Sequence, residues 1–144
     1  MKSEKVFYKA LPCLLSLFIL SIIRSSGGFV KESPLMIKSK LFALQVIDVC
    51  KELRNAKCES ALINQFLRSG TSIGANIREA FYAHGKADFI AKLQIALKEC
   101  SESEYWIELL LESGYYNNKS LLDDCTEVKR ILISSINTAR ENNK

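Results

Sequence analysis

Residues 68–80 read RSGTSIGANIREA, and this stretch decides the fold. Gly70 and Gly74 stand four positions apart in it, while Ile73 and Ile77 keep the spacing of a helix. A glycine inside a helix costs about 1 kcal/mol relative to alanine, because it loses more conformational freedom on folding. A helix that keeps two glycines on one stripe therefore indicates close approach by a second helix, within the chain or between copies.

Apolar residues recur at intervals of three and four on both sides of this stretch and predict four helices. The helices are expected at about residues 34–55, 60–83, 88–113 and 118–140. Ser33 and Pro34 suit the N-cap and first position of the first helix. Ser60 and Asp88 are candidate N-caps, and Gly85 stands where a left-handed C-cap is expected. Short connections and the lack of strand alternation predict an all-α, antiparallel up-down-up-down four-helix bundle.

Residues 1–35 differ in composition from the bundle domain at 36–140 and the tail at 141–144. A run of 13 mostly apolar residues at 11–23 follows three lysines, and it is shorter than the ~20 residues that a spanning helix needs. Three interpretations of this extension stay open: an upstream frame with Met36 as the true start, a signal peptide, or a membrane anchor. The free cysteines favour the first of them, whereas the good helix start at Ser33 and Pro34 speaks against it.

Net charge is concentrated in the extension. Residues 1–35 hold five of the 20 basic and two of the 16 acidic residues, so residues 36–144 carry only +1. This gives no strong bulk field for nucleic acid. The apolar stripes of the first and third helices are wider than one bundle core needs. Surplus apolar surface usually means a partner, and a second copy of the chain is the simplest one.

The cysteine and histidine content argues against a metal site. The five cysteines are odd in number and form no CxxC, which suits free thiols in a reducing, cytoplasmic compartment. Cys50, Cys100 and Cys125 fall at apolar helical positions, where a thiol behaves as a small hydrophobe. His84 is the single histidine and no ligand cluster surrounds it, so neither metal nor cofactor is expected.

Several motifs in order resemble one family. They are KSKLFAL at 38–44, FLRSGTSIGANIREA at 66–80, KADFIAKLQIALKE at 86–99, ESEYWIELL at 102–110 and ESGY at 112–115. Together they resemble the four-helix bundle proteins first noted in intervening sequences of bacterial 23S ribosomal RNA genes. The resemblance spans about residues 36–140 and implies a pentameric ring with no known catalytic residues. A distant relative is the accessory variability determinant of diversity-generating retroelements, a basic, nucleic-acid-binding pentamer from which this near-neutral chain departs in charge.

Two sets of candidate site residues emerge. Candidates for helix packing or for an oligomer interface are Gly70, Ile73, Gly74, Ile77 and Trp106. Candidates for nucleic-acid contact are Arg68, Arg78, Lys86, Lys92 and Lys98. The second set also fits an ordinary solvated face with acidic neighbours, and no aromatic residues alternate with it for base stacking.

Acidic residues 104, 108 and 112 lie four apart on one helix face. They fit a solvated stripe, or a surface that meets a basic face of another protein or subunit, better than an acid–base pair. Arg78 and His84, six apart, loosely resemble the arginine–histidine motif of the nucleotide-binding prokaryotic–eukaryotic bundle ribonucleases.

Three functional hypotheses follow. The first is a non-enzymatic, homo-oligomeric scaffold, expected as a pentamer, with no small-molecule substrate and no membrane partner. The second is an accessory protein that binds RNA or DNA. The third is a bundle-type ribonuclease.

Overall fold

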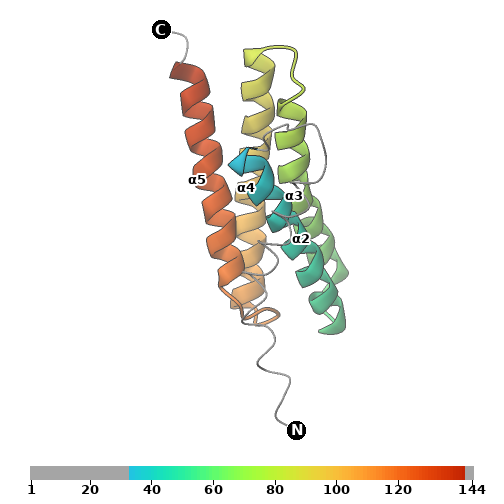
Figure 1. Ribbon diagram of the computed structural model, residues 1–144. Coiled ribbons are helices and arrows are strands. Elements are labelled where there is room, and N and C mark those ends of the chain that lie inside the picture. Colours follow the sequence, from blue (N-terminus) through green and yellow to red (C-terminus); the bar gives the residue numbers. More distant parts are fainter. Residues whose placement is uncertain (1–32, 142–144) are drawn as a thin grey trace, which may run out of the picture. The chain divides into compact units, whose positions relative to one another are not determined.

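The computed structural model describes residues 33–141, which form four antiparallel helices (Figure 1). They are α2 (Pro34–Asn55), α3 (Ser60–Ala80), α4 (Lys86–Glu112) and α5 (Ser120–Glu141), with no strand among the residues described. α3 packs on α2 and α4, and α5 packs on α4 and, less extensively, on α2. α2 and α4 therefore lie on one diagonal of the bundle, and the predicted all-α four-helix fold is confirmed. The interpretations of the N-terminal extension fall on residues outside those described.

α2 begins as its sequence predicts. Ser33 is extended, and its Oγ accepts a hydrogen bond from the N–H of Met36 at 3.3 Å. Pro34 occupies the first position, where its missing N–H leaves no donor unsatisfied. The helix therefore starts within the stretch that the composition assigned to the extension.

The connection between α3 and α4 corrects three boundary predictions. α3 ends at Ala80 rather than at 83, because the N–H groups of Tyr82 and Ala83 turn back to the carbonyls of residues 79 and 80. Gly85 is not a left-handed C-cap: its φ of −174° is extended, and it is the N-cap of α4. Asp88 lies in the first turn of α4 rather than capping it, and its carboxylate accepts the N–H of His84 at 3.3 Å.

The remaining ends follow from local backbone demands. Glu59 rather than Ser60 is the N-cap of α3. Among residues 33–141 the backbone is left-handed at Lys57, with φ of 55°, and at Gly114, with φ of 78°. Gly114 closes the end of α4, where a residue without Cβ meets no steric cost.

The core is a continuous stack of aliphatic side chains with Phe42 and Phe66 fully buried between α2 and α3. A methyl group placed on Gly70 would lie 2.7 Å from Cγ2 of Val46, so this glycine permits the close approach of α3 to α2. A methyl group on Gly74 would meet nothing closer than 3.6 Å, the carbonyl oxygen of Ser39. The two glycines that look equivalent in sequence therefore differ, and only Gly70 marks a tight contact.

Small polar side chains let α3 and α4 approach as well. Ser103 Oγ donates to Ser69 Oγ at 3.0 Å, and Ser69 Oγ lies 3.2 Å from the carbonyl oxygen of Phe66. Both serines are fully buried, and each hydroxyl is hydrogen-bonded, so the desolvation of these polar groups is offset.

The glycine difference gives a stability prediction. Gly70→Ala should lower the free energy of unfolding by about 1–2 kcal/mol. The new methyl group forces the stiff Val46 side chain to move, and the free-energy cost of that movement exceeds the gain in helix propensity of alanine over glycine. Gly74→Ala is the matched control and should leave stability unchanged or raise it by up to ~1 kcal/mol. Urea unfolding followed by circular dichroism measures both. Equal effects of the two substitutions would contradict the assignment of Gly70 as the contact.

Candidate oligomer and nucleic-acid interfaces

α2 carries apolar side chains on its outer face as well as on its inner one. Its inner row, which includes Phe42, Val46 and Leu53, is buried in the core. The outer row, called here the α2 stripe, consists of four side chains that are between 37% and 51% exposed: Ile37, Leu41, Leu44 and Ile47. Spacings of four, three and three place them on one side of the helix. The broad apolar pattern of the first helix thus resolves into a core face and an outer face.

α4 presents a second mixed surface at the other end of the diagonal that it shares with α2. The α4 patch consists of Ile95, Glu102, Tyr105 and Glu108. Ile95 and Tyr105 are exposed, and Lys98 stands between them beside a shallow groove around Ile95. Trp106 is half-buried next to the patch: its Nε1 donates to Glu102 at 3.2 Å, and its ring packs edge-on against that of Tyr105.

Charge is separated between the two halves of the bundle. α2 and α3 together carry six basic and three acidic residues, a net charge of +3. α4 and α5 carry six basic and ten acidic residues, a net charge of −4. The near-zero total that the sequence shows therefore conceals a basic α2/α3 half and an acidic α4/α5 half.

Some of these charged residues are paired with one another within the same chain. Lys38 of α2 pairs with Glu127 of α5 at 2.9 Å, and Gln45 donates to Asp124 of α5 at 2.9 Å. On the acidic half Glu104 forms an ion pair with Lys129. It is therefore not part of a row of unpaired carboxylates with residues 108 and 112. The hydrogen bond from Lys129 to Glu104 also raises the pKa of that lysine.

The five predicted packing residues fall into two groups. Gly70, Ile73 and Ile77 are buried inside the bundle, where Ile73 and Ile77 have no exposed surface. Gly74 and Trp106 are partly exposed and reach the surface. Because the first group packs against helices of the same chain, a contact between copies can use only the second group or residues outside the set.

The five predicted nucleic-acid residues are divided between α3 and α4, and two of them line different grooves. Arg78 of α3 lines a groove between α2 and α3, whereas Lys98 lines the groove on α4. Lys92 pairs with Glu79 at 2.6 Å; this hydrogen bond raises the pKa of the lysine, and the carboxylate offsets its positive charge. Lys86 begins α4, and Arg68 is exposed on α3.

Sequence reasoning missed two residues near Arg78. Lys40 of α2 lines the same groove, of about 250 Å³, whose lining also includes Gly74. Lys40 and Arg78 line one groove because of the packing register of α2 on α3. The sequence pattern does not indicate this register, so it could not predict the groove. Tyr82 lies four residues after Arg78, just beyond the end of α3, and is 82% exposed. Its neighbour Phe81 packs edge-on against Phe89 of α4.

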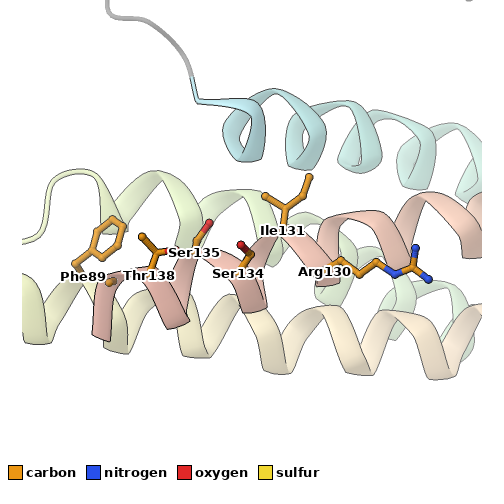
Figure 2. Close-up of a pocket in the computed structure, with 7 residues that line it drawn as sticks. Phe89, Arg130, Ile131, Ser134, Ser135 and Thr138 are labelled. Atoms are coloured by element: carbon orange, nitrogen blue, oxygen red, sulfur yellow. The ribbon is translucent and has the colours of Figure 1, made fainter. Parts of the chain in front are cut away.

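A larger open groove lies along α5 and the start of α4 (Figure 2). Its volume is about 590 Å³, and it is lined by Phe89, Arg130, Ile131, Ser134, Ser135, Thr138 and Ala139. Figure 2 shows Ile131 pointing from α5 towards α2, with Phe89 at one end of the groove and Arg130 at the other. Small-molecule sites enclose most of their ligand and converge a few polar groups on it. This groove is open and offers scattered hydroxyls, so its geometry does not indicate such a site.

The residues named for the ribonuclease hypothesis lie within the part of the chain that the structure describes. Arg78 and His84 are both exposed, and the histidine lies in the connection between α3 and α4. No group of three or more potential metal ligands occurs among residues 33–141. Within the same range, no helix combines the length and hydropathy needed to cross a bilayer.

Comparison with known proteins adds the family context. The family model described as 23S rRNA-intervening sequence protein matches residues 31–134. A solved structure from Bacteroides thetaiotaomicron, described as a protein of unknown function from the S23 ribosomal protein family, is 48% identical. The similarity covers 71% of this chain and 97% of that one, with a TM-score of 0.69. No curated protein matches the chain. The distant link to the retroelement determinant stays a prediction.

Proposed function

The chain belongs to the 23S rRNA-intervening sequence protein family, and from this premise we propose that it is a non-enzymatic scaffold built from copies of itself. The observation that carries the proposal is the α2 stripe. Four aliphatic side chains on one face remain 37–51% exposed although the core beneath them is already filled. Contiguous apolar surface of this kind is typical of a protein–protein contact.

Charge favours a second copy as the partner. Lys40 flanks the α2 stripe on the basic half, where Lys51 is already paired with Asp48 at 2.8 Å, whereas Glu102 and Glu108 belong to the α4 patch on the acidic half. Because α2 and α4 lie on one diagonal, the stripe of one copy can meet the patch of the next without blocking its own patch. Such a contact joins two different surfaces, and repeated contacts of this type close into a ring or continue as a filament. The family resemblance implies a closed ring of five copies.

Light scattering after size exclusion tests the scaffold. The full chain should elute at a multiple of 16.2 kDa, five-fold for the pentamer. The double substitution Leu41→Glu with Leu44→Glu should reduce the mass to that of a monomer, because it places carboxylates in the apolar contact. Ile133→Glu is the matched control, since Ile133 is equally exposed but lies on α5, outside the stripe. A wild-type monomer at micromolar concentration, or a double variant of unchanged mass, would overturn the proposal.

A second candidate function, nucleic-acid binding, is favoured by the groove between α2 and α3. Lys40 and Arg78 line it on the basic half, and no ion pair holds either of them among the described residues. The exposed ring of Tyr82 stands one turn beyond Arg78, where it could stack on a base. An oligomer would repeat this set in every copy and multiply a weak contact.

Fluorescence anisotropy with a labelled single-stranded RNA tests this candidate. The wild-type Kd should rise steeply with salt, because phosphate contacts release counterions. Lys40→Glu with Arg78→Glu should weaken binding at least ten-fold and flatten the salt dependence. Arg130→Glu on the acidic half makes a single charge reversal outside the groove and should change the Kd by less than two-fold. Lack of binding at 50 mM salt, or equal losses in both variants, would exclude the groove as an RNA site.

A further inference from the structure

Two buried cysteine sulfurs meet between α4 and α5. The Sγ atoms of Cys100 and Cys125 lie 3.7 Å apart, and both residues have no exposed surface. Each Sγ also lies 3.5 Å from the carbonyl oxygen of the other residue. This reciprocal arrangement brings the two backbones close together, which is the first requirement for a disulfide.

The other described cysteines are arranged differently. Cys50 Sγ contacts the carbonyl oxygen of Ile63 at 3.9 Å, and Cys58 Sγ contacts that of Glu59 at 4.0 Å. Burial raises the pKa of both thiols. These contacts are with main-chain oxygens, so Cys50 and Cys58 fit the role of small apolar side chains.

We propose that Cys100 and Cys125 are a redox-active dithiol whose oxidation by a peroxide forms a disulfide that fastens α5 to α4. This inference does not depend on the scaffold or on RNA binding. It assigns a covalent modification to two core residues that otherwise fill space.

The reaction balances with hydrogen peroxide as the oxidant. A thiolate of the pair attacks one peroxide oxygen, the O–O bond breaks, and a sulfenic acid forms as hydroxide leaves. The second sulfur then attacks the sulfenic sulfur, the S–O bond breaks, and water is released as the disulfide forms. The protein loses two hydrogens in total, and the peroxide is reduced to two molecules of water.

The pairing supports the first step. Either thiol can donate across the contact between the two sulfurs. When Cys100 is the thiolate, a hydrogen bond from Cys125 stabilises it, so this contact lowers the pKa of Cys100 and raises that of Cys125. Burial and the nearby Glu104 carboxylate oppose a thiolate at Cys100, whereas the nearby Lys129 ammonium favours it. A thiolate is the form that reacts with peroxide.

The position of Cys125 near the start of α5 allows a small oxidant to reach the two buried sulfurs. The residue lies in the second turn of α5, close to the connection at 113–119, and helix ends open more readily than helix centres. α5 is held mainly by α4, since its contact with α2 is the least extensive in the bundle. Figure 1 shows α4 and α5 running side by side. A disulfide here would prevent α5 from separating from α4.

Peptide mapping of the full chain tests the proposal. Reduced protein is treated with a small molar excess of hydrogen peroxide, alkylated, digested without reductant and analysed by mass spectrometry. The expected product is a linked peptide pair containing Cys100 and Cys125, two hydrogens lighter than the thiols. The thermal midpoint should rise by roughly 10 °C, because the cross-link restricts the unfolded chain, and dithiothreitol should reverse the rise.

Two variants separate this reaction from general cysteine oxidation. Cys58→Ser should form the same linked pair and show the same shift in thermal midpoint. Cys125→Ser should form no intramolecular disulfide at Cys100 and show no shift. The proposal is wrong if both thiols remain fully alkylatable in denaturant after peroxide treatment, if Cys100 instead pairs with another cysteine, or if the linked protein melts at a lower temperature.

Discussion

The contact between Gly70 of α3 and Val46 of α2 is the constraint on which the other features depend. A single methyl group at position 70 would lie 2.7 Å from Cγ2 of Val46, so α3 packs directly on the valine side chain and has no room for a side chain of its own there. This approach buries the inner row of α2, including Phe42 and Leu53, against α3 and the core. Among the described helices none covers the outer row of aliphatic residues, and this row is the surface that we propose for contact between copies.

The fold could be read from the sequence because its signals are local. Ser33 and Pro34 start a helix by hydrogen bonding within one turn, and the spacing of apolar residues gives the four helices. The prediction of a left-handed C-cap at Gly85 was wrong. The carbonyls at the end of α3 accept hydrogen bonds from Tyr82 and Ala83, and Gly85 is instead the N-cap of α4. A left-handed cap cannot be told from an extended N-cap by residue type alone.

The candidate surfaces were harder to predict because they depend on how helices pack. Lys40 and Arg78 are 38 positions apart and share a groove only through the register of α2 on α3. The sulfurs of Cys100 and Cys125 meet only through the register of α4 on α5. The opposite charges of the two halves, in contrast, could have been counted from the sequence, because α2 and α3 are consecutive in the chain and so are α4 and α5.

The central claim is that the α2 stripe of one copy is covered by the α4 patch of another. Photo-crosslinking measures this most directly, with a photoreactive phenylalanine analogue in place of Leu44 in the full chain. The account predicts crosslinked dimers whose joined peptides contain position 44 of one copy and the region of Ile95 to Tyr105 of another. Crosslinks from position 44 to α2 of the second copy, or only uncrosslinked monomers, would contradict it.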